Sequence, residues 1–316
     1  MADIIKKATR DSYGQALVEL AEEFPHLVVL DADLAAATKT GGFKKAYPDR
    51  FFDCGIAESN MMGIAAGLAA AGKVVFASSF AMFAAGRAFE QVRNSIGYPH
   101  LNVKIGATHA GISVGEDGAT HQCCEDIALM RTIPGMTILN PADDTEAKKA
   151  VRAALELDGP VYLRFGRLAV PVIFDDSYRF EIGKGVELVP GSDVTVIATG
   201  LMVNEALKAA ETLKTEGISA RVINMATIKP IDRDIILKAA AETGAIITAE
   251  EHNIIGGLGS AVAEVVCETR PVPVLRVGVN DTFGKSGPAV DLLPLFGLSA
   301  EHIAEQARAA VAMKKN

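Results

Sequence analysis

The chain has 316 residues, of which 49% are hydrophobic and 22% charged, a balance typical of folded globular proteins. Its formal net charge is −8 and its Lys and Arg residues are scattered, which argues against a nucleic-acid-binding protein, because such proteins carry a basic patch or stripe. No apolar run reaches the ~18–20 residues that span a membrane, and the N-terminus lacks the apolar centre of a secretory signal.

Short apolar runs alternate with amphipathic stretches along the first half of the chain. We expect strands at residues 27–33, 51–55, 74–79, 103–109, 135–140 and 161–165. We expect helices between them, at residues 12–23, 58–71, 80–96, 125–131 and 143–157. Such alternation is typical of an open, largely parallel sheet covered on both faces.

The alternation stops at residues 170–191, a stretch rich in Pro, Gly and charge that predicts a linker with a short hairpin. A second α/β pattern follows, with expected strands at 194–200, 219–225, 244–250 and 272–278 and helices at 203–214, 232–241, 258–270 and 300–312. The predicted fold class is therefore α/β, with two open, mostly parallel-sheet domains of three layers, α/β/α. We expect these domains at residues 1–172 and 192–316, joined by a linker at 173–191.

Four cysteines occur in the chain, and neither CxxC spacing nor a disulfide framework is present. Reduced thiols are the simplest interpretation, and they are typical of a cytoplasmic protein. We expect such a protein, with no membrane partner.

Glu58 opens a helix rich in Ala and Gly, just after the expected strand that ends at Gly55. This position places its carboxyl at the C-terminal ends of the strands, where open α/β sheets bind ligands. An acidic residue in the first turn also complements the helix dipole, and that role is sufficient for Glu58 taken alone.

Residues 106–122 (GATHAGISVGEDGATHQ) follow a strand and gather His109, Glu116, Asp117 and His121 in one Gly-rich stretch. Such a loop can turn several polar side chains and backbone N–H groups toward one ligand. A metal site is a competing interpretation, but the two histidines lack helical ligand spacing and no cysteine is suitably placed. We therefore expect no metal ligands in this chain.

Arg10 precedes the first helix and Arg167 closes a strand, so both lie at element ends. The guanidinium fork suits phosphate oxygens. Either arginine alone is as easily explained by solvation at the surface.

Several segments together resemble the pyrimidine-binding domain of transketolases: GIAESNMMGIAAGLA, SSFAMF, THAGISVGEDGATHQ and GPVYLRFGR. Residues 247–265 (ITAEEHNIIGGLGSAVAEV) resemble the C-terminal domain of the same family. The resemblance covers almost the whole chain. It implies a transferase of the pentose phosphate pathway that moves a two-carbon ketol unit from a ketose phosphate to an aldose phosphate through a thiamine-diphosphate adduct.

The resemblance implies roles for residues around the cofactor. Glu58 matches the catalytic glutamate that hydrogen-bonds the aminopyrimidine and promotes formation of the reactive ylide. That role needs a protonated carboxyl in an apolar pocket, which the Ala, Met and Gly surroundings fit. Phe80 and Phe83 match aromatic residues that line the pyrimidine, and Asp33 matches a buried aspartate near the cofactor.

The resemblance also implies a phosphosugar site. Asp117 and His121 match groups that bind the hydroxyls and oxyanion of the sugar, so His121 is a second catalytic candidate. Arg10, His109 and Arg167 match the pocket for the substrate phosphate.

Two departures from the family pattern concern substrate and cofactor contacts. Ala37 stands where the family often has a phosphate-binding serine, and Gly86 replaces an aromatic residue. In contrast, His109 favours transketolases over deoxyxylulose-phosphate synthases, which usually carry an aspartate at this position.

The Gly-Asp-Gly motif, which in this family holds Mg²⁺ and the diphosphate together with a later Asn, is absent from the sequence. The resemblance therefore implies the second subunit of a split transketolase, with Mg²⁺ held mainly by a separate diphosphate-binding subunit. The expected assembly is α₂β₂, with self-association of this chain.

Two alternatives remain open at this point. One is another thiamine enzyme subunit, resembling a deoxyxylulose-phosphate synthase or the β subunit of a 2-oxoacid dehydrogenase. The other is a non-catalytic partner module that kept the fold and lost the chemistry.

Overall fold

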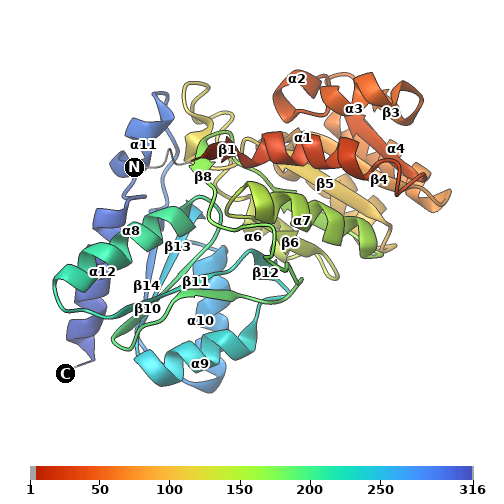
Figure 1. Ribbon diagram of the computed structural model, residues 1–316. Coiled ribbons are helices and arrows are strands. Elements are labelled where there is room, and N and C mark those ends of the chain that lie inside the picture. The colour runs from red at the N-terminus through yellow and green to blue at the C-terminus, as the bar shows by residue number, and fades with distance from the viewer. Residues whose placement is uncertain (1–4, 315–316) are drawn as a thin grey trace.

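The computed structural model describes residues 5–314, which form two open α/β sheets with helices on both faces of each (Figure 1). A seven-stranded sheet has the order β12-β6-β7-β5-β4-β2-β3, and a five-stranded sheet has the order β14-β13-β10-β11-β9. Within each sheet the strands are parallel except one edge strand, β12 or β9. The predicted fold class is confirmed.

The larger sheet is built mainly from the first half of the chain. Its strands are β2 (Leu27–Asp31), β3 (Phe51–Asp53), β4 (Val74–Phe80), β5 (Val103–Thr108), β6 (Thr137–Leu139), β7 (Val161–Arg164) and β12 (Thr227–Lys229). The helices and turns between them are α1 (Thr9–Leu20), α2 (Ala35–Thr38), α3 (Gly41–Ala46), η1 (Pro48–Arg50), α4 (Glu58–Ala70), α5 (Phe89–Gln91), η4 (Ile112–Val114), α6 (Asp126–Arg131) and α7 (Asp144–Glu156).

Successive residues of the larger sheet enter two different cores, because side chains alternate between the faces of a strand. Val28 and Leu30 of β2 pack with residues of α4 and α6, whereas Leu27 and Val29 pack with residues of α1 and α7. All four are buried, so the strand is apolar on both faces as far as Asp31, as expected for a parallel sheet covered on both faces.

The smaller sheet repeats this plan. Its strands are β9 (Val186–Val189), β10 (Val194–Ala198), β11 (Ala220–Asn224), β13 (Ile246–Asn253) and β14 (Val274–Val279), and its helices are α8 (Met202–Thr215), α9 (Arg233–Thr243), α10 (Leu258–Thr269), α11 (Ala289–Leu295) and α12 (Ala300–Met313). One core contains residues of α8 and α12, and the other contains residues of α9 and α10.

The hairpin predicted within residues 170–191 is wrong. Strand β8 (Ala169–Pro171) pairs with β1 (Lys6–Ala8) near the N-terminus, and β9 pairs with β11 of the smaller sheet. Each strand finds a separate partner, so the segment between them crosses from one sheet to the other. Strand β12 was also not predicted. It belongs to the second half of the chain but pairs antiparallel with β6 of the larger sheet.

The helix predicted at residues 80–96 is interrupted. It consists of two π-helical segments, η2 (Met82–Arg87) and η3 (Val92–Gly97), separated by the short helix α5. In η2 the N–H of Ala88 donates to the carbonyl of Phe83 at 3.2 Å, five residues back rather than four. Such π-bulges often occur at functional sites.

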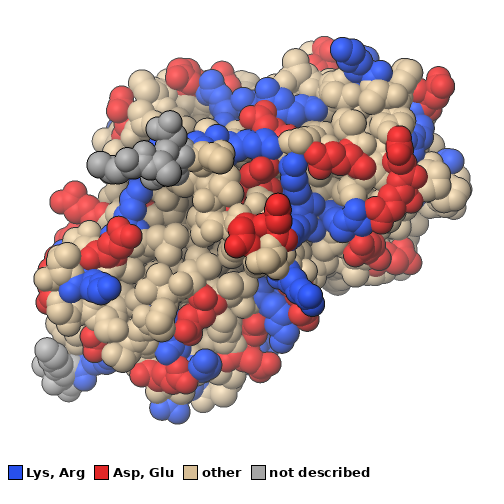
Figure 2. Space-filling view, in the orientation of Figure 1, with Lys and Arg blue, Asp and Glu red and all other residues tan. Residues whose placement is uncertain are grey.

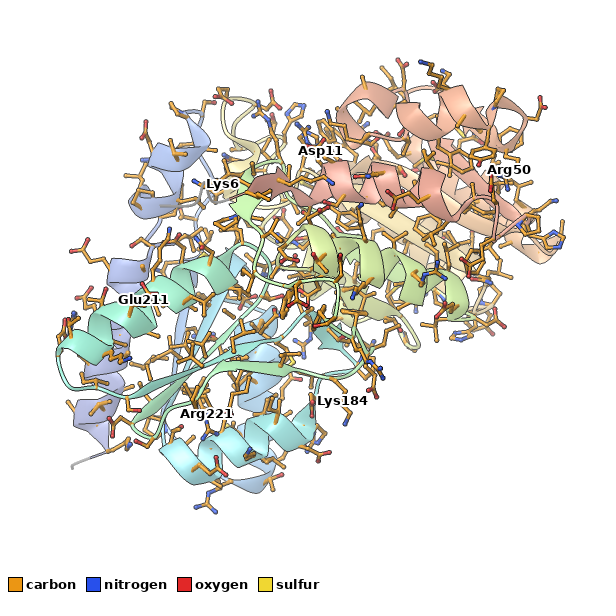
Figure 3. All side chains as sticks on the ribbon, in the orientation of Figure 1. Lys6, Asp11, Arg50, Lys184, Glu211 and Arg221 are labelled. Atoms are coloured by element: carbon orange, nitrogen blue, oxygen red, sulfur yellow. The ribbon has the colours of Figure 1, made fainter. Side chains whose placement is uncertain are left out.

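The surface is mixed in charge. On the face seen in Figure 2, acidic and basic residues are interspersed. Arg50 lies near the C-terminal end of α1 (Figure 3), where it donates to the carbonyls of Ala21 and Phe24 at 3.0 and 3.2 Å. Among residues 5–314, no helix has the length and apolar character needed to cross a membrane.

Candidate active site

Two aromatic rings meet at the C-terminal ends of adjacent parallel strands. Phe80 ends β4 and pairs in register with Thr108, the last residue of β5, so His109 emerges beside Phe80. The rings of Phe80 and His109 stack with centroids 3.8 Å apart. The site thus lies at the edge of the sheet where the sequence predicted it.

His109 is a neutral ring among positive charges. Arg10 can only donate a hydrogen bond, so the 2.8 Å contact of its Nη1 makes His109 Nε2 the acceptor and leaves the ring proton on Nδ1, next to Thr108 Oγ1. Burial, together with the charges of Arg10, Arg167 and Lys39, lowers the pKa of His109 to about 3. A cationic pocket with a neutral histidine is suited to an anion.

The two predicted arginines approach this pocket from different elements. Arg10 lies in α1, and its Nη1 also donates to the Ala37 carbonyl at 3.1 Å. Its Nε is buried and has no hydrogen-bond partner within the described chain. Arg167 follows β7, donates to the Val114 carbonyl and forms an ion pair with Glu116 at 2.8 Å. The structure brings Arg10, Arg167 and His109 close to one another.

His121 packs against the rings of Phe80 and Phe83. The centroid of its ring lies 5.3 Å from that of Phe83, in an edge-on arrangement, and 6.3 Å from that of Phe80. Its Nδ1 lies 2.9 Å from the hydroxyl of Thr120. Asp117 lies in the same loop with an exposed side chain, so it is accessible to a ligand.

Glu58 begins α4 and is 1% exposed. Its Oε2 accepts a hydrogen bond from Arg87 Nη1 at 2.8 Å, and the same guanidinium lies 4.7 Å from the ring centroid of Phe83. Phe83 and Arg87 lie four residues apart in η2, so their side chains face the same side of this segment. Sequence reasoning missed Arg87, because its partner Glu58 lies 29 residues earlier in a different helix.

The prediction that Asp33 is buried is wrong for this chain. Asp33 lies beyond the end of β2 with a left-handed φ of 62° and an exposed side chain. The buried aspartate is Asp31, whose carboxylate accepts hydrogen bonds from the backbone of Leu34 and from the hydroxyls of Thr38 and Thr40, at 2.6–2.8 Å. Asp31 therefore shapes the segment that presents the Ala37 carbonyl to the pocket.

The two departures from the family pattern have local explanations. At residue 37 the backbone carbonyl, not a side chain, contacts the pocket. At Gly86 an added Cβ would overlap the end of the Met82 side chain, which occupies the space that a larger residue would need.

The surroundings of Glu58 fit an aminopyrimidine ring. The planar Arg87 guanidinium makes two contacts there, a hydrogen bond to the carboxylate and stacking on Phe83, which are the contacts that an amino-substituted aromatic ring would make.

The part of the chain that the structure describes contains no group of three or more His, Cys, Asp or Glu residues able to hold a metal ion.

Comparisons with known proteins agree over most of the chain. A family model described as "Transketolase, pyrimidine binding domain" matches residues 5–172, and another described as "Transketolase, C-terminal domain" matches residues 183–303. A solved structure described as "Split gene transketolase, inactive beta4 tetramer" is 55% identical, with a TM-score of 0.91 over 96% of this chain and 98% of that one.

Curated relatives include both separate subunits and longer chains. A Methanocaldococcus jannaschii chain, provisionally named transketolase C-terminal section, is 53% identical over 96% of both chains. A subunit of the apulose-4-phosphate transketolase of Phocaeicola vulgatus is 42% identical over 95% of this chain and 96% of the relative. Human transketolase is 39% identical over 96% of this chain but only 49% of its own length.

Proposed function

The chain belongs to the transketolase family, and we propose that it is one subunit of a split transketolase completed by a separate diphosphate-binding subunit. The proposed enzyme moves a two-carbon ketol unit between a ketose phosphate and an aldose phosphate. Bound thiamine diphosphate supplies the nucleophilic carbon for this transfer, with Mg²⁺ held mainly by the partner subunit. The observation that carries the proposal is the cationic pocket around neutral His109. This pocket lies directly beside Phe80 and close to Glu58.

On the cofactor side, Glu58 binds the aminopyrimidine and exchanges a proton with it, while Phe80 and Phe83 flank the ring. The Arg87 side chain is 51% exposed, so it can turn away when the ring takes its place. Asp33 is assigned to the cofactor as well, and its exposure leaves it open to a group from the partner subunit.

On the substrate side, Arg10, His109 and Arg167 bind the phosphate. The buried, unpartnered Nε of Arg10 and the Arg167–Glu116 pair, which an anion can replace, support this assignment. Asp117 and His121 bind the sugar hydroxyls, and His121 moves a proton at the reacting oxygen. The name of the Phocaeicola vulgatus relative, part of a phosphosugar transketolase, agrees with a phosphorylated substrate.

We also propose the domain limits 1–172 and 192–316, with residues 173–191 between them, and a cytoplasmic α₂β₂ assembly in which this chain self-associates. The first family model ends at residue 172, which supports the first limit, whereas the second model begins at residue 183, within the proposed connecting segment. Four free cysteines in the described part of the chain support a reducing compartment. The tetramer named in the description of the split-gene relative supports self-association.

The test is reconstitution with a diphosphate-binding subunit, thiamine diphosphate and Mg²⁺. We expect the mixture to convert xylulose 5-phosphate and ribose 5-phosphate, and each subunit alone to be inactive. Turnover of pyruvate instead would favour a 2-oxoacid dehydrogenase-type subunit, and an inactive mixture would favour a non-catalytic module.

The Glu58→Ala variant tests the role of the acid. General acid–base groups typically contribute 10²–10⁴-fold, so we expect kcat to fall roughly 100-fold or more. Glu22→Ala, at an exposed glutamate, is the matched control and should keep full activity. Equal activity of the two variants would remove Glu58 from the mechanism.

A further inference from the structure

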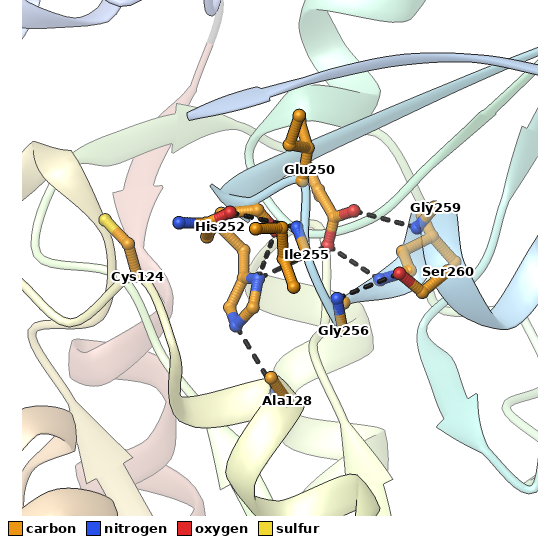
Figure 4. Close-up of polar contacts among 12 residues, drawn as sticks. Cys124, Ala128, Glu250, His252, Ile255, Gly256, Gly259 and Ser260 are labelled. Carbon is orange, nitrogen blue, oxygen red and sulfur yellow. Dashed lines mark hydrogen bonds and ion pairs between the residues drawn. The ribbon is translucent and has the colours of Figure 1, made fainter. Parts of the chain in front are cut away.

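Two neighbouring glutamates at the end of β13 point in opposite directions, as successive residues of a strand do. Glu250 turns toward the start of α10, where its carboxylate accepts the N–H groups of Leu258 and Gly259 at 2.7 and 2.8 Å (Figure 4). Glu251 turns toward the other half of the chain, and its Oε1 accepts the N–H of Ser113 at 2.5 Å. The two carboxylates therefore order different segments.

The segment that Glu251 orders is the Gly-rich loop, residues 106–122. Glu251 is 3% exposed and fills the space under the loop so closely that a Cβ at Gly111 would overlap its carboxyl group. Gly111 also has a φ of 79°, which side chains other than hydrogen rarely tolerate. The loop is thus built around this carboxyl.

The backbone beside Glu251 is tied to the same region. Its carbonyl accepts a hydrogen bond from Arg164 Nη2 at 2.8 Å, and the N–H of Asn253 donates to the carbonyl of Cys124 at 2.7 Å. His252 Nε2 accepts the N–H of Ala128 at 3.3 Å (Figure 4). These contacts fix the end of β13 against the larger sheet, so the Glu251 side chain has a rigid base.

A buried carboxyl is costly unless its oxygens receive hydrogen bonds, so its partners indicate what it does. Burial raises the pKa of Glu251 to about 7, although the nearby Arg164 charge opposes the shift. An apolar residue would avoid this cost but could not accept the Ser113 N–H. The loop N–H is therefore the group that the carboxyl satisfies.

We propose that Glu251 is a positioning residue, through which the C-terminal half of the chain holds the loop that carries His109 and His121. Gly111 lies two residues after His109, so a displaced loop would move the phosphate pocket. The effect on catalysis rests on the proposed function, whereas the effect on loop order does not.

Hydrogen exchange of the isolated chain tests loop order without any assay of activity. We expect Glu251→Ala to speed exchange of the amides of residues 111–118 by roughly 10- to 100-fold, the range for losing a hydrogen bond to a charged acceptor. Glu251→Gln keeps an acceptor oxygen and should stay within about threefold of the wild type. The matched control, Glu250→Ala, should speed exchange at residues 258–261 and leave the loop unchanged. The proposal is overturned if both alanine variants change loop exchange equally or if Glu251→Ala leaves it unchanged.

The reconstituted enzyme tests the consequence for catalysis. We expect Glu251→Ala to lower kcat/KM for xylulose 5-phosphate roughly tenfold, mainly through KM, with Glu251→Gln restoring it and Glu250→Ala retaining it. Equal losses in the two alanine variants would reduce Glu251 to a general stabiliser. If the wild-type mixture transfers no ketol unit, the proposed function fails, and the exchange experiment still decides whether Glu251 holds the loop.

Discussion

Glu146 offers a sharp test of how the two halves of the chain are joined. It lies in α7, is fully buried, and accepts hydrogen bonds from Tyr178 Oη, Asn224 Nδ2 and the Ala142 N–H, each at 2.7 Å. Asn224 ends β11 of the smaller sheet, and Tyr178 lies in the segment between the sheets. The carboxyl therefore links three parts of the fold.

Burial raises the pKa of Glu146 from 4.5 to about 7. Because the folded-state pKa lies above the unfolded one, its contribution to stability is complete below pH 4.5 and is lost as the pH rises through about 7. At about 1.4 kcal/mol per pH unit, the loss is about 3 kcal/mol. Glu146→Gln has a similar shape and does not titrate.

The assay is urea unfolding of the isolated chain between pH 4.5 and 8. The free energy of unfolding of the wild type, minus that of Glu146→Gln, should fall by about 3 kcal/mol across this range and level off above pH 7. Glu211→Gln, at an exposed glutamate on α8 (Figure 3), is the control and should change stability by less than about 0.5 kcal/mol at any pH. A constant difference between wild type and Glu146→Gln would refute the reasoning.

Three other predictions address the site and its scaffold. Arg87→Met removes a half-exposed ion pair worth about 1 kcal/mol, so the reconstituted enzyme should bind thiamine diphosphate roughly fivefold more tightly by calorimetry; weaker binding would mean that Arg87 assists the cofactor. Gly106→Ala would overlap a buried tyrosine hydroxyl and should cost about 1–3 kcal/mol, whereas Gly67→Ala, in open space on α4, should stabilise by about 1 kcal/mol; thermal melts giving the opposite order would contradict the packing. His109→Asn should raise KM for the phosphosugar without altering the pH profile between pH 5 and 8, because the pKa of His109 is about 3; loss of an ionisation in that range would show that His109 titrates there.

The local sequence pattern was sufficient to predict the elements in which buried residues recur at regular positions. The run that became β5 is buried throughout, and its end placed His109 beside the end of β4 before any contact was known. Glu58 was likewise located by a helix start after a strand, a signal that depends only on neighbouring residues. The core of the candidate site could thus be predicted from the sequence.

Features that depend on distant partners could not be predicted. Arg87 pairs with Glu58, which lies 29 residues earlier in α4, and the local sequence pattern around Arg87 gives no sign of that partner. Asp31 and Asp33 are indistinguishable as sequence, and the three donors that bury Asp31 come from the segment beyond them. In the sequence, Glu251 resembles an ordinary polar residue near the end of a strand. Its partner Ser113 lies 138 residues earlier, in the other half of the chain.

Strand β12 makes the two halves of the chain dependent on each other during synthesis. Residues 227–229 cover the β6 edge of a sheet that is otherwise composed of residues 27–164, and the N–H of Asn140 donates to the carbonyl of Ala226 at 2.7 Å beside them. On the ribosome, the first sheet therefore emerges with an open edge and is completed only after residues 227–229 of the second half have been made. Exposed edges pair readily with other chains, so this interval is when nascent copies are most prone to aggregate. A gene shortened to residues 1–191 would keep that edge open permanently.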